Sequence, residues 1–364
     1  MKWLVLVLIL CLSSCHFPSK IAMDGSGGRN SYNIEVQKTN SEEMLLNLVR
    51  LRYYDSPFFL EVSSVTSQFT MRNLAVVGIK IPGFDKTNPM SLGGETQWTN
   101  QPTIQYSPLQ GKEFANQLMQ PLEINTIQQV IYSGWDIDRV FSLTVQNFQE
   151  FPNVPKEGLD PEELERHQKF HEIIQLMTAL QMKGDLQIGI GKTQEKDKDK
   201  DTHSQNIQFA FPSDNKISKK VASIITSEEH VNGKYVLNVV VGFDEKGNIG
   251  ILPRSLLSCM HYLSKGIIIP KKDIEMNKVS LEGKVEHRKE DLERIFKELF
   301  VVCSSDKKPK KAYVCVKYRD SWFYIKDDDL HSKKTFMLLL ELYNLQSGRG
   351  PDKGPILTLP LGVG

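Results

Sequence analysis

The sequence lacks three features that often reveal function: an excess of one charge, many cysteines, and a long apolar run beyond its first residues. Its 364 residues include 45 lysines and arginines against 44 aspartates and glutamates, so no overall charge favours binding to nucleic acid or to anionic lipid. Only five residues are cysteines, which excludes a disulfide-dense scaffold. No internal repeat is visible, so a solenoid or propeller is not expected.

The first residues, by contrast, form a recognisable targeting signal. One lysine precedes an apolar run, Trp3–Leu12, which is typical of an export signal and too short to cross a bilayer. Leu12–Cys15 resembles the bacterial lipobox, whose cysteine becomes the lipid-bearing first residue after cleavage. We expect residues 1–14 to be a signal peptide and Cys15 to anchor the chain in a membrane through lipid. His16, where an aspartate would favour another destination, predicts the outer membrane and its periplasmic face.

The rest of the sequence predicts an α+β fold with mixed or antiparallel sheets and interspersed helices. Residues 15–31 include the Gly25–Gly28 run and no apolar period, which predicts a flexible tether after the lipid. Two α+β domains or subdomains are expected at 32–191 and 206–364, joined by a charged loop at 192–205. Strands and helices do not alternate strictly, so α+β is favoured over a parallel α/β sheet.

Four segments carry clear local patterns. Apolar residues between Met44 and Leu51 recur at helical spacing and predict a helix over residues 40–53. Residues 160–184 begin with an acidic cap and a proline and end at a glycine, which also predicts a helix. Residues 139–148 alternate apolar and polar side chains, as a strand does. Residues 271–291 are polar and are expected to form a loop.

Several familiar motifs are incomplete, so the sequence predicts no cofactor and no metal. Gly191–Thr193 lacks the upstream glycine and the following helix of a phosphate-binding loop. Asp197–Asp201 has the first spacings of a calcium loop but not its glycine or its final glutamate. His167 and His171 lie four residues apart and could share a zinc ion, but the glutamate of a zinc protease is missing. Ser213–Asn215 is better explained as a helix cap than as part of a penicillin-binding site.

Three cysteines remain once the signal is removed and Cys15 is acylated. These are Cys259, Cys303 and Cys315. An odd number allows at most one intramolecular disulfide in an oxidising compartment. Cys303 and Cys315 could form it across a hairpin centred near Pro309, or all could be buried free thiols.

Two clusters of side chains are candidates for function. Asp136, Asp138 and Arg139 follow Trp135 and could supply the acids of a hydrolase, or they could simply be paired charges at a turn. Tyr318–Ile325 is an aromatic hairpin, which is either an exposed platform for a partner or glycan or a part of the core.

Five segments, spread over most of the chain, also carry a resemblance. They are residues 40–60, 106–111, 133–140, 322–325 and 332–336. They resemble a family of uncharacterised bacterial envelope lipoproteins, which implies the envelope location and assigns no activity. The leading hypothesis is therefore a non-catalytic lipid-anchored protein that binds or scaffolds another envelope component. The alternative is a cell-envelope hydrolase whose acidic residues cannot be identified from sequence spacing.

Overall fold

The structure is a computed structural model, and it describes residues 29–77, 92–153, 161–192, 205–225, 230–242, 248–279 and 296–347. The predicted signal peptide, the predicted lipid site Cys15 and the Asp197–Asp201 run lie outside these residues. The chain divides into two compact units: the first comprises Met1–Asn40, Phe58–Leu109 and Gly350–Gly364, and the second comprises Ser41–Pro57 and Gln110–Arg349.

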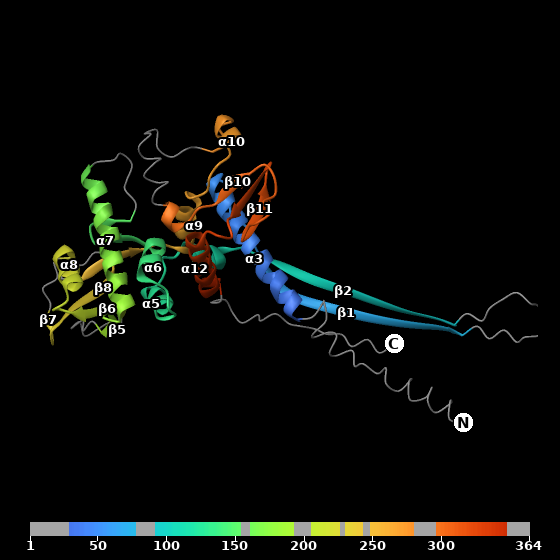
Figure 1. Cartoon of the computed structure of the whole chain (residues 1–364), viewed down its shortest axis with the longest axis horizontal. Helices are drawn as coiled ribbons and strands as arrows, with labels where there is room; N and C mark the ends of the chain where they lie inside the picture. The colour runs from blue at the N-terminus through green and yellow to red at the C-terminus, as the bar shows by residue number, and fades with distance from the viewer. Residues whose placement is uncertain are drawn as a thin grey trace, which may run out of the picture. The chain divides into compact units, whose positions relative to one another are not determined.

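The first unit contains a two-stranded antiparallel sheet. Its strands are β1 (Phe59–Val77) and β2 (Leu92–Leu109), drawn as a ribbon in blue and teal in Figure 1. Their register is continuous except for a β-bulge between Val62 and Ser64. Helix α3 (Arg29–Arg52) begins in this unit and ends in the second. The helix predicted over residues 40–53 is thus confirmed, although it begins earlier.

The larger sheet of the second unit has the strand order β4-β3-β9-β8-β6-β5, with β7 paired to β8. Its strands are β3 (Val145–Phe148), β4 (Phe151–Pro152), β5 (Gln187–Lys192), β6 (Gln205–Pro212), β7 (His230–Val231), β8 (Lys234–Val241) and β9 (Ile249–Pro253). Only the β8–β9 pair among these is parallel. Ile207, Phe209 and Phe211 alternate along β6 and are fully buried, so one face of the sheet forms the core. Because β5 and β6 pair, the segments on both sides of the predicted charged loop contribute to one sheet.

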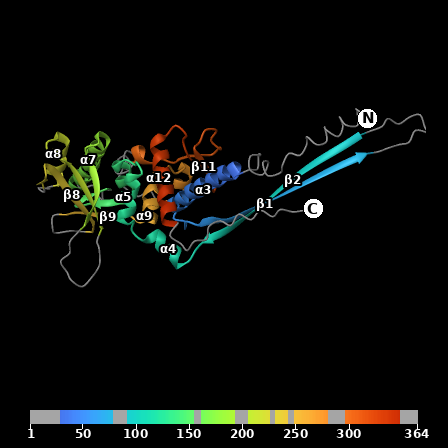
Figure 2. The same cartoon turned by 90° about the horizontal axis from the view of Figure 1, so that it is seen from below.

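Helices pack on this sheet. The helix α7 (Pro161–Lys183) contacts α6 (Ile137–Thr144) and α8 (Lys216–Ile225), and α5 (Ile124–Tyr132) contacts β6. Figure 2 shows α7 and α8 beside the strands. The buried side of α7 carries apolar residues at helical spacing, and these are Phe170, Ile173, Ile174, Met177 and Leu180. This confirms the helix predicted over residues 160–184.

A second, smaller sheet has the order β10-β12-β11. Its strands are β10 (Cys303–Ser305), β11 (Val314–Tyr318) and β12 (Ser321–Ile325). The helices of this part are α4 (Lys112–Met119), α9 (Leu256–Ser264), α10 (Lys271–Glu275) and α12 (Leu330–Ser347). Helices α4, α9 and α12 contact one another. Helix α10 occupies the start of the segment predicted as a loop, and the two mixed or antiparallel sheets with interspersed helices confirm the α+β class.

The strand predicted over residues 139–148 is wrong in its first part. Residues 139–144 belong to helix α6, and only Val145–Phe148 is a strand. Ile137, Val140 and Phe141 have the i, i+3, i+4 spacing of a helix and are all fully buried. The strand prediction, which begins at residue 139, leaves out Ile137, the first residue of this pattern. The last carbonyl groups of α6 accept hydrogen bonds from two buried side chains, Arg254 to Leu143 at 2.9 Å and Asn153 to Ser142 at 2.8 Å. These distant donors satisfy a helix end that local sequence leaves open.

Candidate functional site

A groove of about 390 Å³ is lined by α3, by the loop before β11 and by strands β11 and β12. Its lining residues are Glu42, Glu43, Leu46, Lys308, Cys315, Val316, Lys317 and Trp322. The groove therefore presents two carboxylates, two ammonium groups and one large aromatic ring. A ligand in this groove can therefore form ion pairs, hydrogen bonds and an aromatic contact at one place.

Helix α3 contributes the acidic part of the groove because of the way it packs. Met44, Leu45 and Leu48 are at most 2% exposed, so this face of the helix enters the core. Glu42, Glu43 and Leu46 lie at the border of that face and are half-buried. The acidic side chains are thus held at the surface by the burial of their apolar neighbours.

The alternation of β12 contributes the aromatic part. Side chains alternate between the two faces of a strand, and Phe323 and Ile325 are fully buried, so Trp322 faces the other side of the sheet. Trp322 is half-buried and pairs in register with Lys317 of β11. Lys308 lies above the indole, with its Nζ 5.2 Å from the ring centroid, at cation–π distance. A tryptophan flanked by two exposed lysines is the centre of the groove.

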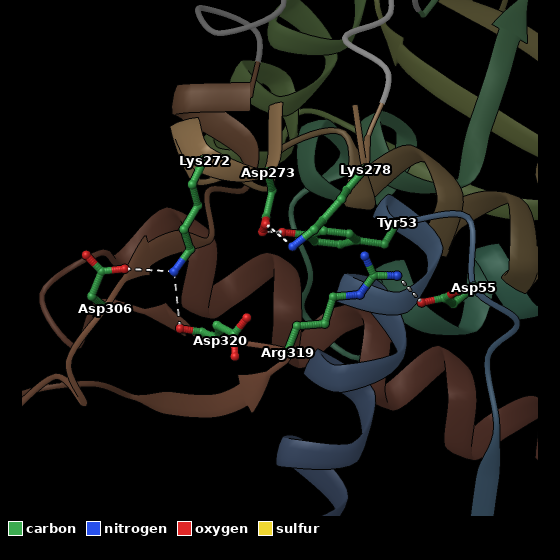
Figure 3. Close-up of polar contacts among 8 residues, drawn as sticks. All are labelled: Tyr53, Asp55, Lys272, Asp273, Lys278, Asp306, Arg319 and Asp320. Atoms are coloured by element: carbon green, nitrogen blue, oxygen red, sulfur yellow. Dashed lines mark hydrogen bonds and ion pairs between the residues drawn. The ribbon is translucent and has the colours of Figure 1, made fainter. Parts of the chain in front are cut away.

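A polar network fixes the end of α3 near this sheet (Figure 3). The hydroxyl of Tyr53, which follows α3, donates a 2.6 Å hydrogen bond to Oδ2 of Asp273. The Nζ of Lys278 donates to Oδ1 of the same carboxylate at 2.9 Å. Asp273 is only 3% exposed, so both of its oxygens are occupied inside the protein.

The turn between β11 and β12 joins the same network. The guanidinium of Arg319 lies 4.8 Å from the Tyr53 ring centroid, and its Nη2 is 3.3 Å from a carboxylate oxygen of Asp55. The hydroxyl of Tyr318 donates to that same oxygen of Asp55. On the other side of the turn, Lys272 contacts Oδ1 of Asp306 at 3.1 Å. Figure 3 shows the contacts of Arg319 with Asp55 and of Lys272 with Asp306 and Asp320.

The network shifts the pKa values of its two buried members in opposite directions. Burial, with the hydrogen bond and charge of Asp273, raises the pKa of Tyr53 well above its ordinary value. Burial alone would raise the pKa of Asp273, but the hydrogen bonds from Tyr53 and Lys278 and the charges of Lys278 and Lys272 lower it overall. Tyr53 therefore stays protonated and Asp273 stays ionised at neutral pH. We infer that the network positions α3 against the β11–β12 turn and so sets the shape of the groove.

The predicted cluster Asp136, Asp138 and Arg139 lies at the start of α6, away from the residues that line the groove. Asp136 is the cap residue of the helix, and its side chain makes no cap hydrogen bond. Burial raises the pKa of Asp138, while the charge of Arg139 and a hydrogen bond from Ser142 oppose the shift. The structure thus brings these three charges together at a buried helix start.

Arg139 of that cluster contacts several distant segments. Its Nη1 donates to the carbonyl of Leu299 at 3.3 Å and to Oγ1 of Thr335 at 3.0 Å, and its Nη2 lies 3.1 Å from Nδ1 of His331. The neighbouring Trp135 donates from Nε1 to Glu341 at 2.7 Å. These bonds join α6 to α12 and to the segment before β10. Arg139 therefore connects elements that are distant in sequence through hydrogen bonds.

The disulfide considered between Cys303 and Cys315 is not formed, and both cysteines are free. The simple hairpin expected between them is interrupted because β12 lies between β10 and β11. Each cysteine pairs in register with Tyr324, one from each side. Two strand spacings of about 4.8 Å separate their backbones by roughly 10 Å, too far for a disulfide. Burial raises the pKa of Cys303 and raises that of Cys259 to about 12, so both remain protonated thiols.

The structure also shows where the remaining sequence motifs lie. The His167 and His171 rings contact edge to face at a centroid distance of 4.6 Å, and burial lowers the pKa of His171 to about 4. No group of three residues able to hold a metal is found within the described part of the chain. Asn215 caps α8, since its Oδ1 accepts the N–H of Ile217 at 2.9 Å, as the cap interpretation predicts. Gly191 and Lys192 pair with β6 inside a strand.

The groove is the feature that sequence reasoning missed. The aromatic hairpin Tyr318–Ile325 was its only signal; its core interpretation is confirmed for two of its residues, and the platform for a partner or glycan stays a prediction. Phe323 and Ile325 enter the core, while Trp322 and Tyr324 lie half-buried on the opposite face. Glu42 and Glu43 could not be assigned to the same place because only tertiary packing joins α3 to β11.

Comparison with known proteins gives no relative: no family model, curated protein or solved structure matches this chain. Within the described residues, no helix is both long enough and apolar enough to cross a bilayer. The functional assignment therefore rests on the groove and on the N-terminal sequence.

Proposed function

We propose that this protein is a lipid-anchored component of the bacterial envelope that binds another envelope component through the groove of α3, β11 and β12. Its anchor would be lipid on Cys15, its location the periplasmic face of the outer membrane, and its role non-catalytic. The observation that carries the binding role is Trp322, half-buried and flanked by Lys308 and Lys317 opposite a helix that supplies two glutamates.

The chemistry of the groove favours a polypeptide partner. Glu42 can accept hydrogen bonds from lysine, arginine or backbone amides, and Lys308 and Lys317 can donate to carboxylates or backbone carbonyls. The groove's formal charges cancel, so a strongly acidic polymer would be repelled by one part of it. Trp322 offers a flat apolar surface of the kind that dominates binding energy in protein interfaces.

The anchor is supported by the apolar run Trp3–Leu12 and by the lipobox Leu12–Cys15. Cells producing the full chain, either unchanged or as Cys15→Ser, would be labelled with radioactive palmitate and fractionated. We expect label in the unchanged protein in the outer-membrane fraction and none in the Cys15→Ser variant. Equal labelling of both forms, or an unlabelled protein in the soluble fraction, would contradict the anchor.

The binding role is tested with a photo-crosslinking residue placed at Tyr313, which is exposed beside β11, in intact cells. Truncating a hot-spot residue of an interface, a class enriched in tryptophan, costs about 2 kcal/mol or more, or about 30-fold in affinity. We therefore expect Trp322→Ala and Lys317→Glu to lose the crosslinked polypeptide. Lys183→Glu is the matched control, because Lys183 is an exposed lysine at the end of α7 and does not line the groove.

The outcomes of this test separate three functions. A reproducible polypeptide adduct that is lost in Trp322→Ala and kept in Lys183→Glu supports the proposal. An adduct that survives both groove variants refutes the groove as its binding site. Absence of any protein adduct, combined with capture of glycan or lipid, refutes the polypeptide partner.

A further inference from the structure

The groove follows one border of the smaller sheet. In the order β10-β12-β11, β11 is a border strand, and among the described strands it pairs only with β12. Three consecutive residues of β11 line the groove, and these are Cys315, Val316 and Lys317. Because neighbouring side chains of a strand point to opposite faces, a groove that all three line lies along the border of β11 and not over one face of the sheet.

The position of helix α3 supports the same placement. Tyr53, directly after α3, contacts Phe323 on the buried face of the sheet, with ring centroids 6.0 Å apart. Trp322 faces the opposite side, yet it lines the groove together with Glu42 and Leu46 of α3. Residues from the two sides of a sheet meet around one groove where the sheet ends. The groove therefore has α3 as one wall and the edge of β11 as the other.

The backbone of β11 has hydrogen-bonding groups directed to this edge. In an antiparallel pair, residues alternate between bonding to the partner strand and pointing their backbone groups away. The carbonyl of Ile325 in β12 accepts the N–H of Tyr313 at 2.9 Å, so the backbone of Ile325 points toward β11. The register partner of Ile325 is Val314. Cys315 and Lys317, one and three positions later, therefore direct their N–H and C=O groups away from β12.

Backbone groups along the edge of a strand are suited to pairing with another extended chain. Such a chain binds as an added strand, and main-chain hydrogen bonds supply part of its affinity. We infer that the polypeptide partner of the groove contributes an extended segment that pairs as a fourth strand beside β11. Cys315 and Lys317 then exchange up to four hydrogen bonds with this segment. The inference rests on the proposed binding role and specifies how the partner is held.

The walls of the groove indicate which side chains such a segment carries. Alternate side chains of an added strand lie over Trp322 and beside α3. Those over Trp322 meet its ring and the ammonium groups of Lys308 and Lys317, which favours aromatic or acidic residues. Those beside α3 meet Leu46 and Glu42, which favours apolar or basic residues. Proline is not expected at the paired positions, because it has no N–H to donate.

The test adds variants of the sheet to the intact-cell crosslinking at Tyr313. Cys315→Pro removes one outward N–H and keeps the bonds between β11 and β12, so it should lower the yield of the polypeptide adduct about tenfold. Cys315→Ala keeps that N–H and should retain the adduct. The matched control is Ser304→Pro in β10, which should also retain it. Ser304 is the register partner of Phe323, whose backbone bonds to β11, so Ser304 has its outward N–H at the opposite border of the same sheet.

Amide hydrogen exchange of the crosslinked adduct provides a measurement that needs no proline variant. The reference is the same protein, bearing the crosslinking residue, before irradiation. Strand addition should slow the exchange of the Cys315 and Lys317 amides at least about tenfold, because these amides become hydrogen-bonded. Val314 and Val316 already bond to β12, so their amides should keep their exchange rates.

The outcomes separate the mode of binding from the binding role itself. Loss of the adduct in Cys315→Pro but not in Ser304→Pro, with slowed exchange at Cys315 and Lys317, supports strand addition. An adduct that is lost in Trp322→Ala but kept in Cys315→Pro leaves the groove as the binding site and refutes strand addition. If a proline variant does not fold, the adduct's exchange decides: unchanged rates at Cys315 and Lys317 overturn the inference. Absence of any polypeptide adduct refutes the binding role and strand addition together.

Discussion

The bond between Tyr53 and Asp273 offers the sharpest test of the network that positions the groove. In Tyr53→Phe the ring and its contact with Arg319 can remain, but the 2.6 Å hydrogen bond to Asp273 is lost. Asp273 would then keep only the bond from Lys278 while being 3% exposed. A hydrogen bond to a charged group contributes about 1.5 to 3 kcal/mol, so we expect the free energy of unfolding to fall by about 2 kcal/mol at pH 7.

The loss should depend on pH in a defined direction. The folded state holds the pKa of Asp273 below its ordinary value, so this carboxylate stabilises the fold above that value. The contribution disappears as pH falls through the pKa of the folded state. Because Tyr53 supplies part of the shift, the difference between the unchanged protein and Tyr53→Phe should be largest at neutral pH and should shrink toward about 1 kcal/mol in acid, where only a neutral hydrogen bond remains.

Urea unfolding of the full chain, followed by circular dichroism at pH 7 and at about pH 4 and below, measures this difference. The control is Tyr262→Phe, since Tyr262 is also buried but its hydroxyl has no hydrogen-bond partner among the described residues. Removing an unpartnered hydroxyl should leave stability unchanged or raise it by up to about 1 kcal/mol. A Tyr53→Phe loss no larger than that of Tyr262→Phe, or one that grows in acid, would refute the reasoning.

Three further predictions concern buried residues outside the groove. Burial lowers the pKa of His171 to about 4 from 6.5, so stability should decline as pH falls between these values, because only the unfolded state binds the proton. His171→Phe should remove up to about 3 kcal/mol of that decline in unfolding curves measured across this range. Gly266→Ala would place a Cβ against the carbonyl oxygen of Phe300, and thermal unfolding should show a loss of about 2 kcal/mol. Arg139→Met removes donors to Leu299 and Thr335 and should cost about 2 to 3 kcal/mol; full stability with lost cellular function would instead favour a hydrolase.

Local sequence patterns predicted the helices that have a clear apolar spacing or a clear N-terminal cap. The apolar spacing from Met44 to Leu51 and the capped helix starting near residue 160 are of this kind, and both are confirmed in α3 and α7. The start of α6 was predicted as a strand because the alternation was read from residue 139, which leaves out Ile137, the first buried residue of the helical pattern. Its last carbonyl groups accept hydrogen bonds from Arg254, more than a hundred residues later, which no local pattern reveals.

The candidate site was harder to predict because no local segment contains it. Cys303 and Cys315 have the spacing of a hairpin pair, yet β12 enters between their strands from later in the chain. The acids of the groove come from α3 and its lysines from the region of β11, so their proximity is a consequence of tertiary packing. The aromatic hairpin alone gave a local signal, because alternation in a strand separates the residues of its two faces.

The pKa shifts in the network also indicate what Tyr53 and Asp273 do in this structure. A general acid or base works best when its pKa lies near the working pH, and the shifts here go the other way. The pKa of Asp273 is lowered and that of Tyr53 is raised, so neither group exchanges a proton near neutrality. Both carboxylate oxygens of Asp273 are already occupied by Tyr53 and Lys278. Tyr53 and Asp273 therefore have the properties of a rigid support, and the partner proposed above would instead contact Trp322 and the exposed Lys308 and Lys317 of the groove.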